Sequence, residues 1–267
     1  MSFYGDSFVF NGIPSELYDL RIFNFDSSGL VGGSAGGDAS IYEQWLYRRE
    51  SPYFYGRYYQ NSLEFDFTVG SFSHIDGNSR HAIETWLLGK STYLPLRIVQ
   101  GDIADVVYNV ILSRSTHLYV GNLNYALTLH AKCDRPWAIT YPPTVTKTYS
   151  DGLNTETFNY FNASSYGGYN RPVITFTMDT SGSSTNYFSL INASDDDREF
   201  RFDNLTPLEQ ITVDNDKGII TSSTSALRMD KFNQKFFRTV QGLNVLTLSG
   251  YFTEFTIDAV FASGVGV

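Results

Sequence analysis

Apolar and polar side chains alternate strictly over residues 63–69, which have the sequence LEFDFTV. A period of two predicts a β-strand that places its apolar side chains on one face. Farther along, residues 79–89 (SRHAIETWLLG) space Ile83, Trp86 and Leu87 at i, i+3 and i+4, as on one face of a helix. The pattern therefore predicts one short helix whose apolar stripe covers a face of a sheet.

The residues on either side of this predicted helix support its ends. Asp76, Asn78 or Ser79 can cap the first turn, and Gly89 stands where a helix is expected to stop. Alternation resumes directly afterwards. It predicts strands at residues 94–98, 106–112 and 118–133.

Two segments near the N-terminus differ in character. Residues 3–25 hold two apolar patches on either side of an Asn-Gly-Ile-Pro sequence, which predicts a strand, a turn and a second strand. Residues 26–40 are rich in Gly and Ser, which predicts a flexible loop. The loop lacks the Gly-Lys-Ser/Thr ending of a phosphate-binding loop, so we expect no nucleotide site there.

Residues 41–60 have aromatic side chains at both odd and even positions, so a strand here would be apolar on both faces. It is either a central strand buried between a sheet and a helix, or an arm buried against another subunit. The segment also has three arginines; unpaired charge is costly in a core, whereas Tyr and Arg are favoured in interfaces. The candidate oligomer-interface residues are Trp45, Tyr47, Arg48, Tyr53, Phe54 and Tyr55.

Helical periodicity is nearly absent from the second half of the chain. Short alternating runs recur there about every ten residues between turn residues, which is typical of a β-sandwich. The predicted strands are residues 173–178, 187–191, 199–202, 210–213, 218–221, 243–249 and 255–259. A Tyr-Pro-Pro-Thr sequence predicts a stiff connector within residues 138–150. We therefore expect a mainly β protein with two domains, residues 1–140 and 141–267.

Composition supports a β-rich fold and narrows the function classes. Of 267 residues, 42% are apolar, 18% charged and 16% aromatic, which favours strands. The net charge of −9 disfavours nonspecific binding to nucleic acid, yet it allows DNA to slide through a channel without sticking. The single cysteine, Cys133, excludes an intrachain disulfide. With no signal-peptide pattern and no run of about 18 apolar residues, we expect neither secretion nor a membrane span.

No motif predicts catalysis or metal binding. The sequence has four histidines, which are His74, His81, His117 and His130. None has a partner at zinc-site spacing, and Cys133 has no evident histidine partner. The acidic sequences at 195–197 and 214–216 lack the calcium-loop pattern and are expected to be turns, the second closing a hairpin. We therefore expect no enzyme activity, no cofactor and no metal site.

Seven short segments form a further pattern when taken in order. In the first half they are residues 63–69, 86–90 (WLLGK), 93–96 (YLPL) and 127–137 (LTLHAKCDRPW). In the second half they are residues 205–214 (LTPLEQITVD), 218–220 (GII) and 241–250 (QGLNVLTLSG). Together they resemble the distal tail protein (Dit) family, the tail-tip hub proteins of long-tailed bacteriophages.

The resemblance implies an N-terminal β-sandwich or barrel-like domain with one packed helix, similar to tail-tube folds, and a C-terminal galectin-like β-sandwich. It implies a structural hub of the virion tail tip, assembled in the host cytoplasm, with six copies in a ring around a DNA channel. The implied partners are the tail tube protein, a tail-associated tip protein and receptor-binding proteins. The family brings no catalytic residue and no support for a sugar site.

Two other function classes compete with a structural ring protein. A carbohydrate-binding β-sandwich module would stack exposed aromatic side chains such as Trp137, Tyr166 and Tyr169 on sugar rings, although these side chains can equally fill a seam between domains. A glycan-processing enzyme would need a pair of acids, which the sequence does not locate. The aromatic segment and the lack of a catalytic motif favour the ring protein.

Overall fold

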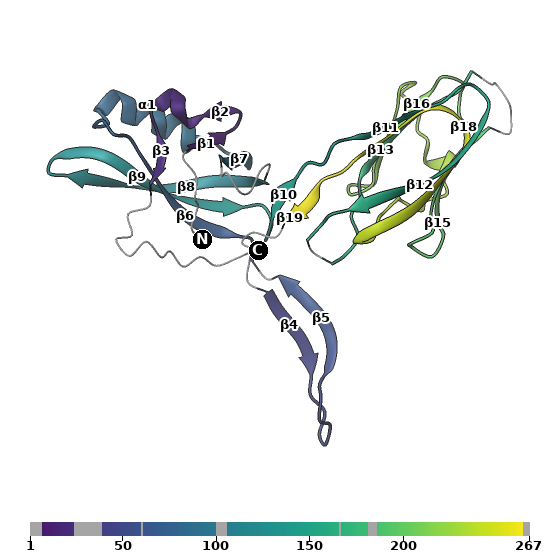
Figure 1. The fold of residues 1–267 in the computed structure, drawn as a ribbon, viewed down its shortest axis with the longest axis horizontal. Helices are drawn as coiled ribbons and strands as arrows, with labels where there is room; N and C mark the ends of the chain where they lie inside the picture. Colours follow the sequence, from purple (N-terminus) through teal and green to yellow (C-terminus); the bar gives the residue numbers. More distant parts are fainter. Residues whose placement is uncertain are drawn as a thin grey trace. The chain divides into compact units, whose positions relative to one another are not determined.

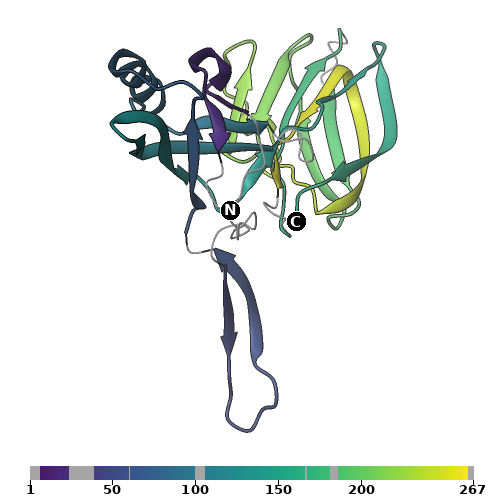
Figure 2. The ribbon, with the colours of Figure 1, turned by 60° about the vertical axis from the view of Figure 1, so that its left-hand side comes forward.

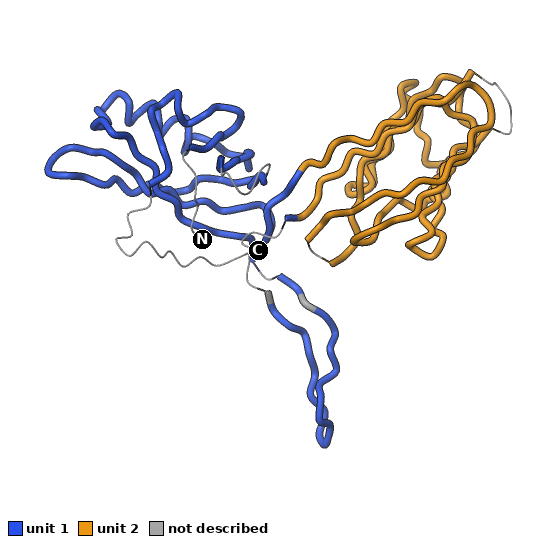
Figure 3. The backbone as a smooth tube through the Cα atoms, in the orientation of Figure 1, with its two compact units in different colours: residues 1–140, 263–267 blue, residues 141–262 orange. Residues whose placement is uncertain are grey.

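The computed structural model of this protein describes residues 7–23, 39–59, 61–99, 106–165, 167–180 and 186–263. The chain divides into two compact units, one formed by residues 1–140 with 263–267 and the other by residues 141–262 (Figure 3). Strands predominate in both units, and α1 is the one α-helix in the described part of the chain. The predicted mainly β fold is confirmed.

The first unit holds the N-terminal strands, the helix and a long hairpin (Figure 1). Its elements are β1 (Ser7–Phe10), β2 (Ile13–Pro14), the 3-10 helix η1 (Ser15–Tyr18), β3 (Arg21–Phe23), β4 (Ala39–Gln44), β5 (Tyr53–Tyr59), β6 (Glu64–Gly70), α1 (Gly77–Leu87), β7 (Leu94–Val99), β8 (Val106–Val120), β9 (Leu123–Cys133) and β10 (Ala138–Thr140). The main sheet has the order β2-β1-β7-β8-β9-β6-β3, with antiparallel neighbours and with β10 beside β8. β4 and β5 form a separate two-stranded sheet.

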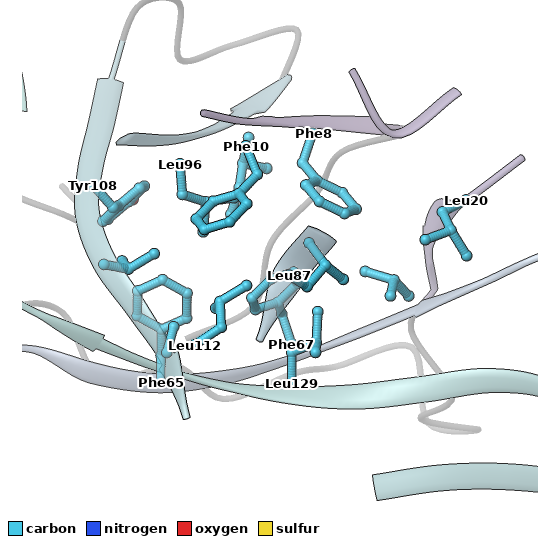
Figure 4. Packing of buried hydrophobic residues seen from close by; sticks show 14 of the residues in the cluster. Phe8, Phe10, Leu20, Phe65, Phe67, Leu87, Leu96, Tyr108, Leu112 and Leu129 are labelled. Atoms are coloured by element: carbon cyan, nitrogen blue, oxygen red, sulfur yellow. The ribbon is translucent and has the colours of Figure 1, made fainter. Parts of the chain in front are cut away.

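The main sheet curls, so that strands far apart in its order share one core. Phe8 on β1 packs edge-to-face on Phe67 of β6 with 5.8 Å between ring centroids, although β7, β8 and β9 separate these strands in the sheet. Phe65 of β6 makes a similar contact with Tyr108 of β8 at 5.3 Å. Figure 4 shows these side chains meeting in one cluster. The inward face of β6 is the one that the alternation over residues 63–69 predicts.

α1 confirms the predicted helix and its apolar stripe. The Asp76 carboxylate accepts a hydrogen bond from the Ser79 N–H at 2.7 Å, which caps the first turn. On the stripe, Trp86 stacks against Tyr18 with 4.6 Å between ring centroids, and Leu87 is fully buried in the sheet's core. Local signals, a cap and a 3.6-residue period, are enough to specify this element.

The prediction of one long strand at 118–133 is wrong. The chain reverses at Gly121 and Asn122, so that β8 and β9 are two paired strands. Gly121 has a φ of +62°, a left-handed conformation that suits glycine in a tight hairpin turn. Strand-like sequence continues on both sides of this turn, so periodicity alone does not reveal it.

The predictions for the N-terminal segments are met in part. Both apolar patches form strands, β1 and β3, while the sequence between them holds β2 and η1 in addition to the turn. Of the predicted flexible loop, residues 26–38 lie outside the described residues, and Ala39 and Ser40 begin β4.

The second unit is a β-sandwich (Figure 2). Its elements are β11 (Val145–Thr148), β12 (Leu153–Asn162), β13 (Val173–Met178), β14 (Tyr187–Asn192), β15 (Arg198–Asp203), β16 (Gln210–Asp214), β17 (Ile219–Ser222), the 3-10 helix η2 (Met229–Lys231) and β18 (Gly242–Asp258). The last strand of the chain, β19 (Phe261–Ser263), pairs with β10 instead. β16 and β17 form the predicted hairpin around the 214–216 turn. The strands predicted at 243–249 and 255–259 are both parts of β18, so they are one element rather than two.

β18 belongs to both layers of this sandwich. Its first part, residues 242–251, lies between β12 and β14, and its last part, residues 252–258, lies between β11 and β13. The layers therefore have the orders β15-β14-β18-β12 and β11-β18-β13-β16-β17. Phe176 of one layer stacks on Phe188 of the other with 3.8 Å between ring centroids, at the centre of the unit's core.

Two features of this unit differ from the predictions. The connector predicted over residues 138–150 is shorter, because β10 and β11 occupy both of its ends and pair with β8 and β18. Residues 141–144 remain between them. β12 is not predicted at all, because each of its faces mixes apolar and polar side chains and so shows no hydrophobic period.

Candidate interaction surface

The hairpin formed by β4 and β5 exposes aromatic side chains on both of its faces. Tyr47 is 90% exposed, Phe54 67% and Trp45 61%. The other large exposed side chains of this hairpin are Ile41, Tyr42, Leu46, Tyr53, Tyr55 and Tyr58. Within the described residues, the interpretation of this segment as a buried central strand is wrong, as is its description as a single strand.

A β-bulge shapes the hairpin. Tyr42 pairs with Gly56, but the next pair is Glu43 with Phe54, which leaves Tyr55 as an extra residue on β5. Gly56 has a φ of +132°, where a side chain would be strained, although an added Cβ would meet no atom within 4 Å. The bulge thus requires glycine at position 56 for its backbone conformation, and not because a side chain would collide with a neighbour.

Contacts inside the hairpin order its aromatic rings without covering them. Tyr42 and Tyr55 lie 5.2 Å apart between ring centroids, and the Tyr55 hydroxyl donates to the Gln44 side chain at 3.2 Å. The indole N–H of Trp45 donates to the Glu43 carboxylate, also at 3.2 Å. These contacts hold the rings outward as an exposed surface.

Arginines at the tip of the hairpin lie over its rings. The Arg49 guanidinium lies 3.7 Å from the centre of the Tyr53 ring, and the Arg48 guanidinium 5.2 Å from that of Tyr47. Residues 39–59 contain three arginines and two glutamates, a net charge of +1, so the rest of the chain carries −10. The hairpin is therefore a basic, aromatic surface on an acidic protein.

An isolated two-stranded hairpin is at best marginally stable in water. This one has no third strand among those the structure describes, and large exposed apolar patches on soluble proteins usually mark interaction sites. The six predicted interface residues all lie on this hairpin, three on β5 and three in the segment that joins the strands. The predicted set omits Ile41, Tyr42 and Tyr58, which are also exposed on this hairpin. They belong to the same segment with large apolar side chains at both odd and even positions.

The other candidates from sequence form ordinary structural contacts. His117 bonds to the Glu84 carboxylate at 2.8 Å, and His130 to Asp66 at 2.7 Å. In the described residues, no group of three or more His, Cys, Asp or Glu side chains could hold a metal ion. Cys133 is buried, which raises the pKa of its thiol to about 12, so the reactive thiolate is scarce.

The aromatic residues proposed for sugar stacking do not form one described platform. Trp137 packs edge-to-face on Tyr59 with 5.5 Å between ring centroids. Tyr169 lies under the Arg238 guanidinium, 3.5 Å from its ring centre, and Arg238 in turn binds the buried Asp195 at 2.7 Å. Tyr166 lies outside the described residues. No helix in the described part of the chain is both long and apolar enough to cross a membrane.

Two family models match successive parts of the sequence. One is described as a phage tail protein N-terminal domain and matches residues 3–135; the other is described as a phage tail C-terminal domain and matches residues 140–258. The chain belongs to the phage tail proteins. It is therefore a structural component of a virion tail rather than a member of an enzyme family.

The fold of this phage tail protein is also that of a solved tail protein. It matches the Dit protein of phage SPP1, described as a paradigm of the hub adsorption apparatus in phages that infect Gram-positive bacteria, with a TM-score of 0.67. The match covers 96% of this chain and 98% of the SPP1 protein at 12% sequence identity. The family models thus confirm a phage tail protein, and the fold confirms the resemblance to distal tail proteins. Among curated proteins, no sequence matches this phage tail protein.

Proposed function

We propose that this phage tail protein is a hub of the tail tip, in which six copies form a ring around a DNA channel. The ring joins the tail tube protein to a tail-associated tip protein and to receptor-binding proteins. The observation that carries the proposal is the hairpin of residues 39–59, whose exposed aromatic faces need a partner. The full-length likeness to a hub protein supports the same role.

The hairpin suits a contact between copies of the same chain. The hairpin has a net charge of +1, and the rest of each copy has a net charge of −10. The arginines of the hairpin can therefore pair with acidic side chains of a neighbouring copy. The aromatic rings supply apolar area, and Tyr, Trp and Arg are the residues that most often dominate interface energetics. When one patch binds a different patch on the next copy, the contact repeats from copy to copy, and it forms a ring when the rotation between copies closes after six of them.

The overall acidity of the protein fits a channel for DNA. A basic channel would bind the phosphate backbone and slow its passage. With a net charge of −9, we expect acidic or neutral side chains to line the pore. DNA would then pass without electrostatic capture.

Replacing both Trp45 and Tyr47 by Ala tests the ring. Each truncation at an interface hot spot typically costs about 2 kcal/mol, and the loss recurs at every contact around the ring. Light scattering should show that the ring-sized species disappears, while the circular dichroism spectrum stays that of the wild type. Negative-stain images of the wild type should show six-fold rings with a pore.

Leu227→Ala is a matched control, because Leu227 is also strongly exposed but lies in the other unit. It should leave the ring intact. A wild-type protein that forms no ring at high concentration, or a double variant that still forms rings, would contradict the proposal. Unfolding of the double variant would assign the hairpin to the interior of its own subunit.

A further inference from the structure

β12 is an edge strand of the second unit and pairs along its whole length with β18 alone among the described strands. Its ten residues run without a proline, a glycine or a bulge. Figure 1 shows it beside β18 in the sandwich. The side of β12 that faces away from β18 therefore offers a row of backbone N–H and C=O groups, about 33 Å long, with which another strand can pair.

Sheet proteins usually protect such an edge with charged side chains, proline or a bulge. The outward side chains of β12 are all uncharged; they are Leu153, Thr155, Thr157, Asn159 and Phe161. Leu153 is 60% exposed and Phe161 65%. The strand's one charged residue, Glu156, is on the other face, where its carboxylate accepts hydrogen bonds from Lys147 and Tyr149. The edge is thus open to strand pairing.

The outward side chains of β12 are arranged symmetrically about Thr157. Apolar Leu153 and Phe161 stand four residues before and after it, and polar Thr155 and Asn159 stand two residues before and after it. An antiparallel pair of identical strands centred on Thr157 therefore sets Leu153 against Phe161, Thr155 against Asn159 and Thr157 against its own copy. Only a partner with the same sequence makes use of this symmetry.

We propose that β12 pairs antiparallel with β12 of a second copy of this chain, across a two-fold axis at Thr157. The pairing extends the β15-β14-β18-β12 layer through the axis and adds about ten backbone hydrogen bonds. It repeats contacts that β12 already makes with β18, where Thr157 lies 3.0 Å from Thr247 between hydroxyl oxygens and Phe161 pairs with Leu243. Each copy has a net charge of −9, so two copies repel each other overall. The side chains that face each other in this contact are uncharged and add no repulsion of their own.

This contact is separate from the hairpin contact in the proposed ring. A two-fold contact joins copies in pairs whatever else they form. If the ring exists, the pairing joins two rings face to face; if it does not, the pairing makes a dimer. Loss of the two-fold contact therefore halves the particle mass in either case, whereas loss of the hairpin contact leaves dimers.

Charge substitutions at Thr157 test the register, because this residue meets its own copy. Thr157→Lys and Thr157→Glu should each halve the mass measured by light scattering on the full chain, since like charges then face each other. An equimolar mixture of the two variants should recover the wild-type mass, because opposite charges then meet. Thr221→Lys, on the exposed edge strand β17, is the control and should leave the mass unchanged.

A cysteine at the axis gives a second measurement that does not depend on weakening the contact. Under mild oxidation Thr157→Cys should give a covalent dimer, and Thr221→Cys should not, while the buried native Cys133 stays reduced. Either charge variant keeping the wild-type mass, a mixture that fails to recover it, or equal cross-linking at both cysteines would overturn the proposal.

Discussion

Glu209 lies buried in the second unit beside Arg228. Its carboxylate accepts two hydrogen bonds from the Arg228 guanidinium, at 2.7 and 2.9 Å, one from the Thr206 N–H at 2.9 Å and one from the Ser222 hydroxyl. Burial acts to raise the pKa of Glu209, but the hydrogen bonds outweigh it and lower the pKa to about 2. The pair holds β16, the end of β17 and the segment before η2 together.

Since the folded pKa of Glu209 is below the ordinary value of 4.5, the carboxylate stabilises the fold fully above about pH 4.5 and loses this effect as the pH falls toward 2. Glu209→Gln leaves the Arg228 charge without its partner. We expect a loss of about 3 kcal/mol in the free energy of unfolding at pH 7, measured with urea, and a smaller difference from wild type at pH 3.

Asp203→Asn is the control for this experiment. Asp203 pairs with Arg201 at a partly exposed site, where an ion pair contributes less than about 1 kcal/mol. A Glu209→Gln variant as stable as the wild type at pH 7 would show that the buried pair contributes nothing net.

At the scale of elements, β18 depends on one glycine. Gly250 stands near the point where the partners of β18 change from β12 and β14 to β11 and β13, and it has a φ of +138°. An added Cβ would lie 2.1 Å from the Tyr187 carbonyl oxygen, far inside contact distance. No side chain fits there unless β14 and β18 separate.

Gly250→Ala should therefore destabilise the second unit by more than about 3 kcal/mol, through the clash and the strained φ together. Thermal melting followed by circular dichroism would measure the loss. Gly168→Ala is the matched control, because Gly168 also has a positive φ, +143°, but an added Cβ would meet nothing within 4 Å. If the two variants lose equal stability, the strained φ rather than the close contact explains the effect.

The sequence predicts α1 and most sandwich strands because their signals are local: the Asp76 cap, the Ile83 to Leu87 stripe and the alternation in strands such as β13. Prediction from the sequence fails where an element depends on residues far away along the chain. β12 shows no hydrophobic period, because each of its faces mixes apolar and polar residues, and its position is set by pairing with β18, which lies far along the chain. Aromatic residues at both odd and even positions predict that a strand at 41–60 has two apolar faces. They do not predict whether those faces are buried within the same subunit or against another one. Glu209 and Arg228 are separated by nineteen positions, and no spacing rule pairs them.

At the scale of the whole molecule, the buried apolar residues form two separate clusters. Leu129 lies in the cluster of the first unit and Phe188 in that of the second. Since the residues of each cluster all come from one unit, we predict that the two units melt separately. Separate melting would also test the domain boundary expected at residue 140.

Phe188→Ala should remove about 4 kcal/mol from one unit and lower one calorimetric transition by roughly 10 °C or more, while the other stays in place. Leu129→Ala should lower the other transition instead. One shared transition that moves in both variants would show that the units unfold together and that the two-domain division has no thermodynamic meaning.

The shared strand of the second unit also has a mechanical consequence. In a sandwich whose layers touch only through side chains, a sideways load can make one layer slip over the other. Here a load on β14 passes into β18 through hydrogen bonds and along covalent bonds to the part of β18 that holds β13. Sliding of one layer over the other is therefore resisted by the covalent backbone of β18, which connects the two layers.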